Sequence, residues 1–167
     1  TVCPYAKIAK CEEGCLNTAG RGGIFKKGEA TNVIQKARLR KTMLFHNEYD
    51  IFMTQLVTDI TKFVAFCGRK DKTPCIRLNG TSDIQWEHQK IDNKNVFELF
   101  PDVQFYDYTK ILGRKVAHIP NYHLTFSAAD GNDADVLKAI AQGMNVATVF
   151  GLKKTEPMPE SYNGRTV

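Results

Sequence analysis

The sequence predicts an α/β protein built on a parallel sheet, and two observations lead to this fold class. From residue 75 onward, short apolar segments rich in β-branched and aromatic residues recur about every twenty to thirty residues. Segments with helical periodicity and helix-capping residues fill the intervals. Strands that alternate with helices at this spacing usually pair in parallel. We therefore expect part of a TIM-like (β/α) barrel or, alternatively, an open doubly wound sheet.

Length and composition indicate one ordinary domain. The chain has 167 residues, of which 43% are hydrophobic and 25% charged, enough to bury a core of its own. It has no uninterrupted run of about eighteen apolar residues and no secretory signal, so we expect a cytoplasmic protein without a membrane segment. The pattern of a new segment starts near residue 164, and we expect the single domain of residues 1–167 to be truncated at its C-terminus.

Two helices are predicted between the N-terminal region and the first strand. Asn32 or Thr31 can cap the first helix, which extends to about residue 44. In the second helix, apolar residues at spacings of three and four form a stripe, and Gly68 is placed to end it. The stripe consists of Phe52, Leu56, Ile60, Phe63 and Cys67.

The four predicted strands cover residues 75–78, 103–108, 122–126 and 145–150. Two capping boxes are expected between them, Ser82-x2-Gln85 and Asn95-x2-Glu98, each opening a short helix. Pro101 closes the second of these helices. Asp133 can cap a helix over residues 134–142, which Gly143 ends.

Polar residues follow three of the predicted strands. Ligands of parallel α/β proteins bind at the carboxyl ends of the strands, so these residues are candidates for a site. We assign catalytic roles to Asp83, Asp107 and Lys110, and cofactor or substrate binding to Asn79, Ser82, Tyr108 and Ser127. Ser82, Thr109 and Asp130 equally fit the role of helix or turn caps.

Three cysteines lie within the first fifteen residues, Cys3, Cys11 and Cys15, ahead of a glycine-rich segment. An odd total of five cysteines without a secretory signal argues for metal binding rather than for disulfides. Three thiolates suit a [4Fe–4S] cluster with one open iron, the arrangement by which radical S-adenosylmethionine enzymes bind their cofactor. The spacing C-x7-C-x3-C differs from their usual C-x3-C-x2-C, so the similarity lies in the ligand set alone.

Two other interpretations of the cysteines remain open. A structural zinc ion would need a fourth ligand, for which Cys67, Cys75 and His46 are candidates. Alternatively, the thiols carry no metal. Cys67 falls on an apolar helical stripe and fits a buried core position equally well.

The first half of the chain is basic. Residues 1–77 contain 14 Lys and Arg against 7 Asp and Glu, whereas the remainder contains 9 against 11. Arg38, Arg40 and Lys41 form the densest group and could contact the phosphates of a nucleic acid. A solvated helix face is the alternative explanation.

Several long blocks of the sequence together resemble the gene product 88 proteins of bacteriophages and related mobile elements. The resemblance implies a phage protein acting in the cytoplasm of the host cell, and a family sequence that continues beyond Val167. The blocks cover residues 11–22, 38–42, 77–84, 100–110 and 121–127.

Two functions from different classes remain in view. The first is an iron–sulfur enzyme, with the radical S-adenosylmethionine type as the candidate class. In it the three cysteines are cluster ligands and S-adenosylmethionine is a second cofactor. The second is a non-enzymatic nucleic-acid-binding protein in which the cysteines hold a structural metal.

Overall fold

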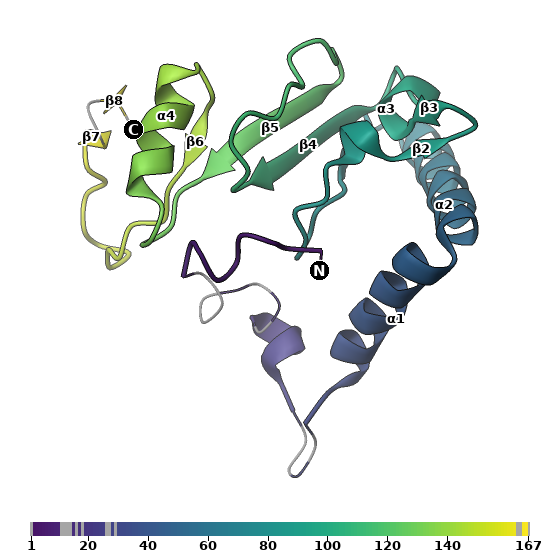
Figure 1. Ribbon diagram of the computed structural model, residues 1–167, viewed down its shortest axis with the longest axis horizontal. Coiled ribbons are helices and arrows are strands. Elements are labelled where there is room, and N and C mark those ends of the chain that lie inside the picture. Colours follow the sequence, from purple (N-terminus) through teal and green to yellow (C-terminus); the bar gives the residue numbers. More distant parts are fainter. Residues whose placement is uncertain are drawn as a thin grey trace.

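The computed structural model describes residues 2–10, 15, 17, 19–25, 28, 30–162 and 165–166. Within these residues, one sheet of four parallel strands forms the centre of the fold, as Figure 1 shows. Its order is β1-β4-β5-β6, so each strand is added beside the previous one and the order never reverses. The predicted α/β class with a parallel sheet is confirmed. The described strands do not close into a barrel. The strands are β1 (Cys75–Arg77), β4 (Gln104–Thr109), β5 (Tyr122–Ser127) and β6 (Val146–Ala147).

Along each of the two central strands, successive side chains point alternately to a buried face and to an open face of the sheet. In β4 and β5 every second residue is buried, and Phe105 pairs with Tyr122 in register. We call the side with Phe105, Leu124 and Phe126 the helix face, because these side chains lie in the two hydrophobic clusters that the helices complete. The opposite side, which presents Tyr106 and His123, is called the open face.

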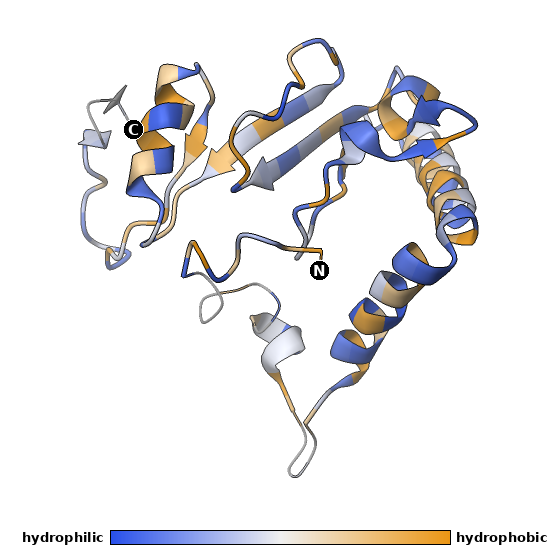
Figure 2. Cartoon of the chain, in the orientation of Figure 1, coloured by the Kyte–Doolittle hydropathy of each residue, from blue (hydrophilic) through white to orange (hydrophobic). Residues whose placement is uncertain are grey.

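Two helices precede the sheet, α1 (Val33–Asn47) and α2 (Tyr49–Arg69). Met53, Ile60 and Cys67 of α2 are buried at intervals of seven residues, which places one stripe of the helix on the core. Ile60 and Cys67 were predicted there, and Phe52 and Leu56 pack against the core. Phe63 was not correctly placed, since it is 40% exposed. Figure 2 shows apolar and polar residues interspersed along both helices.

Averaged over its length, α2 is long and apolar enough to cross a membrane, although no uninterrupted apolar run marks it in the sequence. Met53 and Ile60 of its buried stripe belong to the main hydrophobic core, together with Trp86 and Phe105. The core accounts for these buried residues, whereas only 17% of the apolar window of α2 is buried and Ile51 and Phe66 of the same helix are exposed.

The connection from β1 to β4 contains η2 (Trp86–His88), β2 (Lys90–Ile91), β3 (Lys94–Asn95) and α3 (Val96–Leu99). The predicted capping box of Asn95 and Glu98 is confirmed at the start of α3. The one at Ser82 is wrong, because the Ser82 hydroxyl donates to the side chain of Asn79 and only the short helix η2 follows. The β2–β3 hairpin was not predicted.

The helix α4 (Asp133–Ala141) joins β5 to β6 and packs on the helix face, where Val136 and Ala139 contact Phe126. Gly143 follows it with a φ of 79°, as a C-terminal cap requires. Asn132, rather than Asp133, occupies the N-cap position. The last predicted strand is shorter than expected, since β6 has two residues. The small hairpin of β7 (Ser161–Tyr162) and β8 (Arg165–Thr166) comes after it.

Candidate functional site at the carboxyl edge of the sheet

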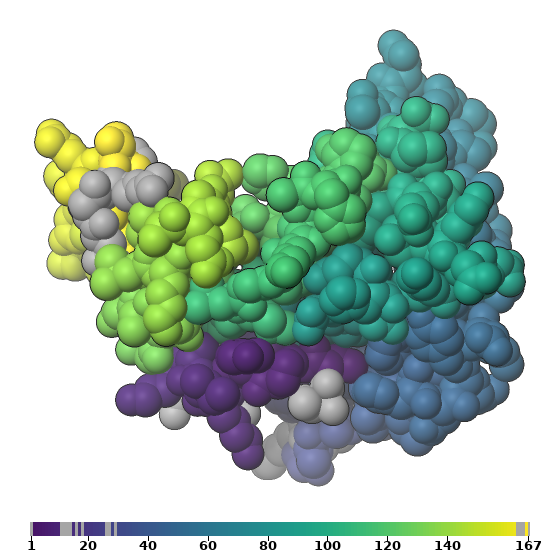
Figure 3. Space-filling model, turned by 45° about the horizontal axis from the view of Figure 1, so that its top comes forward, coloured from purple at the N-terminus to yellow at the C-terminus, as the bar shows by residue number. Residues whose placement is uncertain are grey.

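The N-terminal segment, residues 2–10, crosses the carboxyl ends of the parallel strands. Near its start, the carbonyl of Val2 accepts a 2.7 Å hydrogen bond from the backbone N–H of Asp83, in the loop after β1. Near its end, Ile8 and Ala9 lie against Gly131, in the loop after β5. Figure 1 shows this purple segment beside the arrowheads of β4 and β5, and Figure 3 shows it packed against the body of the molecule. Cys3 is therefore brought to the edge where parallel α/β proteins bind ligands.

Close packing fixes the far end of this segment. A Cβ atom at Gly131 would lie 2.9 Å from the carbonyl oxygen of Ile8, closer than real contacts allow. Ala9 is only 2% exposed. The absence of a side chain at Gly131 thus permits the N-terminal segment to reach the edge of the sheet.

The side chains of α1 hold the glycine-rich segment that follows the cysteines. The Asn32 side chain caps α1 through its oxygen and donates through its nitrogen to the carbonyls of Arg21, Gly22 and Ile24 at 2.8–3.3 Å. One turn further on, the Gln35 amide donates to the carbonyls of Asn17 and Gly22. The short helix η1 (Gly20–Gly23) is thereby fixed to the start of α1.

Arg38 continues this set of contacts. Its Nη1 donates to the backbone carbonyl of Asn17 at 2.8 Å and to the side-chain oxygen of the same residue at 3.1 Å. The predicted phosphate-binding residue therefore has a structural partner, whereas Arg40 and Lys41 are exposed. A Cβ atom at Gly22 would lie 2.9 Å from the carbonyl oxygen of Asn17. A glycine is required for this packing.

Of the three candidate metal ligands, Cys3 and Cys15 lie within the described residues and Cys11 lies outside them. Cys15 Sγ accepts a hydrogen bond from the backbone N–H of Asn17 at 3.4 Å, an interaction typical of sulfur ligands to metals. Among the described residues, no group of three His, Cys, Asp or Glu side chains could hold a metal ion.

Within the described residues, the candidate fourth ligands are not gathered with Cys3 and Cys15 into a group that could hold a metal ion. Cys67 is buried in the stripe of α2, and Cys75 is exposed on the first residue of β1, at the amino end of that strand. His46 is in the last turn of α1.

A buried polar network lies on the helix face of the sheet at its carboxyl ends. The Asn79 backbone N–H and side-chain amide both donate to the carboxylate of Asp107, at 2.7 and 3.3 Å. The Asn79 carbonyl oxygen Oδ1 accepts from the Trp86 indole at 3.1 Å. Asn79 and Asp107 are 0% and 1% exposed, so these two predicted site residues meet inside the protein.

Asp83 and Arg114 extend the network. The Asp83 carboxylate accepts from the Thr109 hydroxyl at 2.7 Å and from the Lys110 backbone N–H at 2.8 Å. The Arg114 guanidinium contacts Asp83 at 3.4 Å and forms two hydrogen bonds of 2.9 and 2.6 Å to Glu87. In the described part of the chain, no buried side-chain nitrogen or oxygen lacks a hydrogen-bond partner.

The titration of Asp107 reflects its burial. Removal from water raises the pKa of this carboxyl to about 6, against the opposing effects of hydrogen bonds from Asn79 and Tyr122 and of the charges of Arg114 and Arg77. Burial likewise raises the pKa of Tyr122, whose hydroxyl remains protonated and donates to Asp107 at 3.3 Å. A carboxyl that titrates near neutrality can exchange a proton at physiological pH.

The other predicted site residues lie on the open face. Tyr108 is 37% exposed, and the Arg77 guanidinium carbon lies 4.7 Å from the centre of its ring. The Lys110 ammonium donates to the Ser127 hydroxyl at 3.1 Å across β4 and β5. The predicted residues therefore form two groups on opposite sides of the sheet. Asn79, Ser82, Asp83 and Asp107 belong to the buried network, and Tyr108, Lys110 and Ser127 belong to the open face.

Sequence reasoning missed Arg114, Glu87 and Tyr122 in the network, and Arg77 and His123 on the open face. Arg114 lies between strands in a loop with no periodic pattern, so no local signal marks it. Arg77 and His123 occupy alternate positions of predicted strands, and the period of two would have placed them opposite the core residues.

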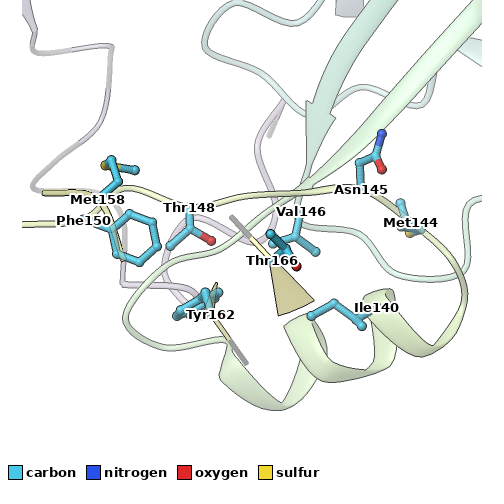
Figure 4. Close-up of a pocket in the computed structure, with 9 residues that line it drawn as sticks. All are labelled: Ile140, Met144, Asn145, Val146, Thr148, Phe150, Met158, Tyr162 and Thr166. Carbon is cyan, nitrogen blue, oxygen red and sulfur yellow. The ribbon is translucent and has the colours of Figure 1, made fainter. Parts of the chain in front are cut away.

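Two pockets open near the ends of the sheet. One of about 300 Å³ lies between α1 and the loop after β1, and it brings Arg38 and Lys41 together with Ser82 over an apolar floor that includes Phe45 and Trp86. The second, of about 440 Å³, is lined mostly by apolar side chains of α4, β6 and the C-terminal residues (Figure 4).

Comparison with known protein families identifies the family of this chain. A family model described as Gene product 88 matches residues 1–165, almost the whole length. The chain belongs to the gene product 88 family. The predicted phage affiliation is thereby confirmed, whereas no likeness to radical S-adenosylmethionine enzymes is supported. No curated protein and no solved structure matches the chain.

Proposed function

We propose that this gene product 88 protein binds an iron–sulfur cluster through Cys3, Cys11 and Cys15 at the carboxyl edge of its sheet. The observation that carries the proposal is the course of residues 2–10, which are fixed beside the loops after β1 and β5. The thiol-bearing segment thus lies where parallel α/β proteins bind cofactors. The one-directional strand order is also that of a section of a (β/α) barrel.

The donor chemistry of the described residues fits such a group. Cys15 sulfur accepts a backbone hydrogen bond, as cluster ligands commonly do. The side-chain amides of Asn32 and Gln35 donate to the carbonyl oxygen of Gly22, which preorganises the backbone of the glycine-rich segment after the cysteines. A bound cluster would supply one-electron chemistry, and an open iron would offer a coordination position for a second cofactor such as S-adenosylmethionine.

The protein's own residues would provide the surroundings of the cluster. The buried network holds the loops after β1 and β4 in place through Asn79 and Asp83. On the open face, Lys110 and Ser127 present a cation and a hydroxyl at the ends of their strands. We retain Asp107 as the candidate for proton exchange, because burial raises its pKa to about 6.

Metal analysis tests the proposal directly. Protein purified anaerobically should contain iron and sulfide, and Cys3→Ser, Cys11→Ser and Cys15→Ser should each lose most of both. Cys75→Ser is the matched control, because its exposed thiol lies at the amino end of β1, and it should keep the cluster.

The metal content also separates the alternatives. Zinc in place of iron would support the non-enzymatic alternative with a structural metal and reject the cluster. If the purified protein contains no bound metal, both the cluster and the structural metal are rejected. Loss of iron in Cys75→Ser as well would show that the three N-terminal thiols are not the complete ligand set.

A further inference from the structure

The open face of the sheet combines aromatic rings with positive charge. Its two exposed tyrosines, Tyr106 and Tyr108, are each 37% exposed, and their ring centres are 6.5 Å apart. Large aromatic side chains in the middle of a parallel sheet are usually covered by helices or by other strands. Here the described helices contribute their buried side chains to the clusters of the helix face.

No carboxylate belongs to the open face among the residues of the described parallel strands. Asp107, the one acidic residue of these strands, points to the helix face and enters the buried network. The side chains that the alternation places on the open face are those of Cys75, Arg77, Gln104, Tyr106, Tyr108, His123, Thr125, Ser127 and Ala147. The face therefore favours an anionic ligand.

The cations are ordered by neighbouring groups. Arg77 lies over the ring of Tyr108 at 4.7 Å, and its Nε donates to the carbonyl of Asn79 at 2.7 Å. Lys110 is held by Ser127 at the carboxyl end of the same strand as the tyrosines. Arg77, Tyr106 and His123 lie in one row across three strands. Positive groups thus flank the rings on two sides.

We propose that the open face binds single-stranded nucleic acid. Its bases stack on Tyr106 and Tyr108, and its backbone phosphates contact Arg77 and Lys110. Exposed aromatic rings on a sheet provide stacking surfaces for any base, and adjacent cations follow the phosphates. A duplex keeps its bases inside the stack, so this surface selects single strands. The binding needs no bound metal, although Lys110 also belongs to the proposed surroundings of the cluster. It uses none of the basic residues of helix α1.

Fluorescence anisotropy of a labelled oligothymidylate of twelve nucleotides tests this interaction with the full chain at low salt. Tyr106→Ala and Tyr108→Ala should each weaken binding by about 5- to 100-fold, because each removes a stacking ring. Tyr106→Phe and Tyr108→Phe keep the rings and should bind within about twofold of wild type. Phe66→Ala removes a comparably exposed ring, 47% exposed, from α2 and should leave binding unchanged.

Salt dependence identifies the phosphate contacts. Lys110→Gln should reduce the slope of log K against log salt by about 0.7, the value for one phosphate contact to a single strand. The double variant Arg40→Gln/Lys41→Gln on α1 should keep the slope. Circular dichroism confirms that each variant is folded.

Three results would overturn the proposal. The first is a duplex of the same length that binds as tightly as the single strand. The second is wild-type binding by the tyrosine-to-alanine variants, and the third is loss of binding in Arg40→Gln/Lys41→Gln alone, which would place the nucleic acid on α1. Because the readout requires no iron, its failure is distinguishable from failure of the proposed cluster.

Discussion

At the scale of single residues, Asp107 shows how burial changes the pKa of a carboxyl group. Its carboxylate accepts two hydrogen bonds from Asn79 and one from Tyr122, and it is 1% exposed. These hydrogen bonds favour the charged form, yet removal from water dominates and raises the pKa to about 6. The folded protein therefore binds a proton at Asp107 more tightly than the unfolded chain does.

This shift predicts a specific pH dependence of stability. Between the ordinary pKa of 3.8 and the folded value of about 6, the native state holds more protons at Asp107, so its contribution to the free energy of unfolding falls as pH rises. The loss should approach about 3 kcal/mol by pH 7, as an order of magnitude. Asp107→Asn lacks this titration, and the difference in unfolding free energy between wild type and variant should change by that amount.

Chemical denaturation of both proteins at intervals from pH 4 to pH 7 measures the effect. Contributions of all other groups are shared by the two proteins and cancel in the difference. Parallel profiles over this range would contradict the assignment of a raised pKa to Asp107.

At the scale of secondary-structure elements, the N-terminus of α1 fixes the glycine-rich segment. Asn32 caps the helix and donates to three carbonyls of the segment, and Gln35 and Arg38 bond to it from the next two turns. The contacts arise because residues three apart share one face of a helix. One helix end thus orders residues that lie 8 to 21 positions earlier in the chain.

Asn32→Ala should lower the free energy of unfolding by about 1–2 kcal/mol, because a helix cap and three carbonyl contacts, one of them half-buried, are lost together. Thr31→Ala is the matched control. Thr31 is exposed directly before the cap residue and should change stability by less than about 0.5 kcal/mol. Urea denaturation compares the two variants, and equal effects would argue against Asn32 as the cap.

At the scale of the whole molecule, the N-terminal segment and the sheet depend on each other. Residues 2–10 reach the carboxyl edge because Gly131 leaves room for the backbone of Ile8 and Ala9. The loop after β5 therefore fixes Ile8 and Ala9, although about 120 residues separate them from Gly131 in sequence. A substitution at Gly131 should therefore loosen residues 2–10 while leaving the sheet intact.

Gly131→Ala should loosen residues 2–10, since its Cβ would lie 2.9 Å from the carbonyl oxygen of Ile8. Limited trypsin digestion should cleave after Lys7 and Lys10 faster than in wild type, while the protected core persists. Gly80→Ala is the control, because a Cβ there meets nothing within 4 Å, and its cleavage rate should match that of wild type. An unchanged rate in Gly131→Ala would show that the segment is not held there.

The sequence by itself determined the parallel α/β class, the four strands, the two long helices and the gene product 88 affiliation. These depend on local periodicity, on caps such as Asn95 and Gly143, and on long recognisable blocks. Alternation along a strand also decides that Asp107 and Tyr108 point to opposite faces, although both had been assigned to one site.

Only the tertiary structure decided which of these residues meet. Ser82 carries the local signature of a helix cap but bonds to Asn79, because the loop folds back onto the buried network. Arg114 enters that network from an irregular loop, and Gly131 contacts the distant N-terminus. Such contacts depend on strand register and loop paths. Those follow from packing the whole chain and carry no periodic signal along the sequence.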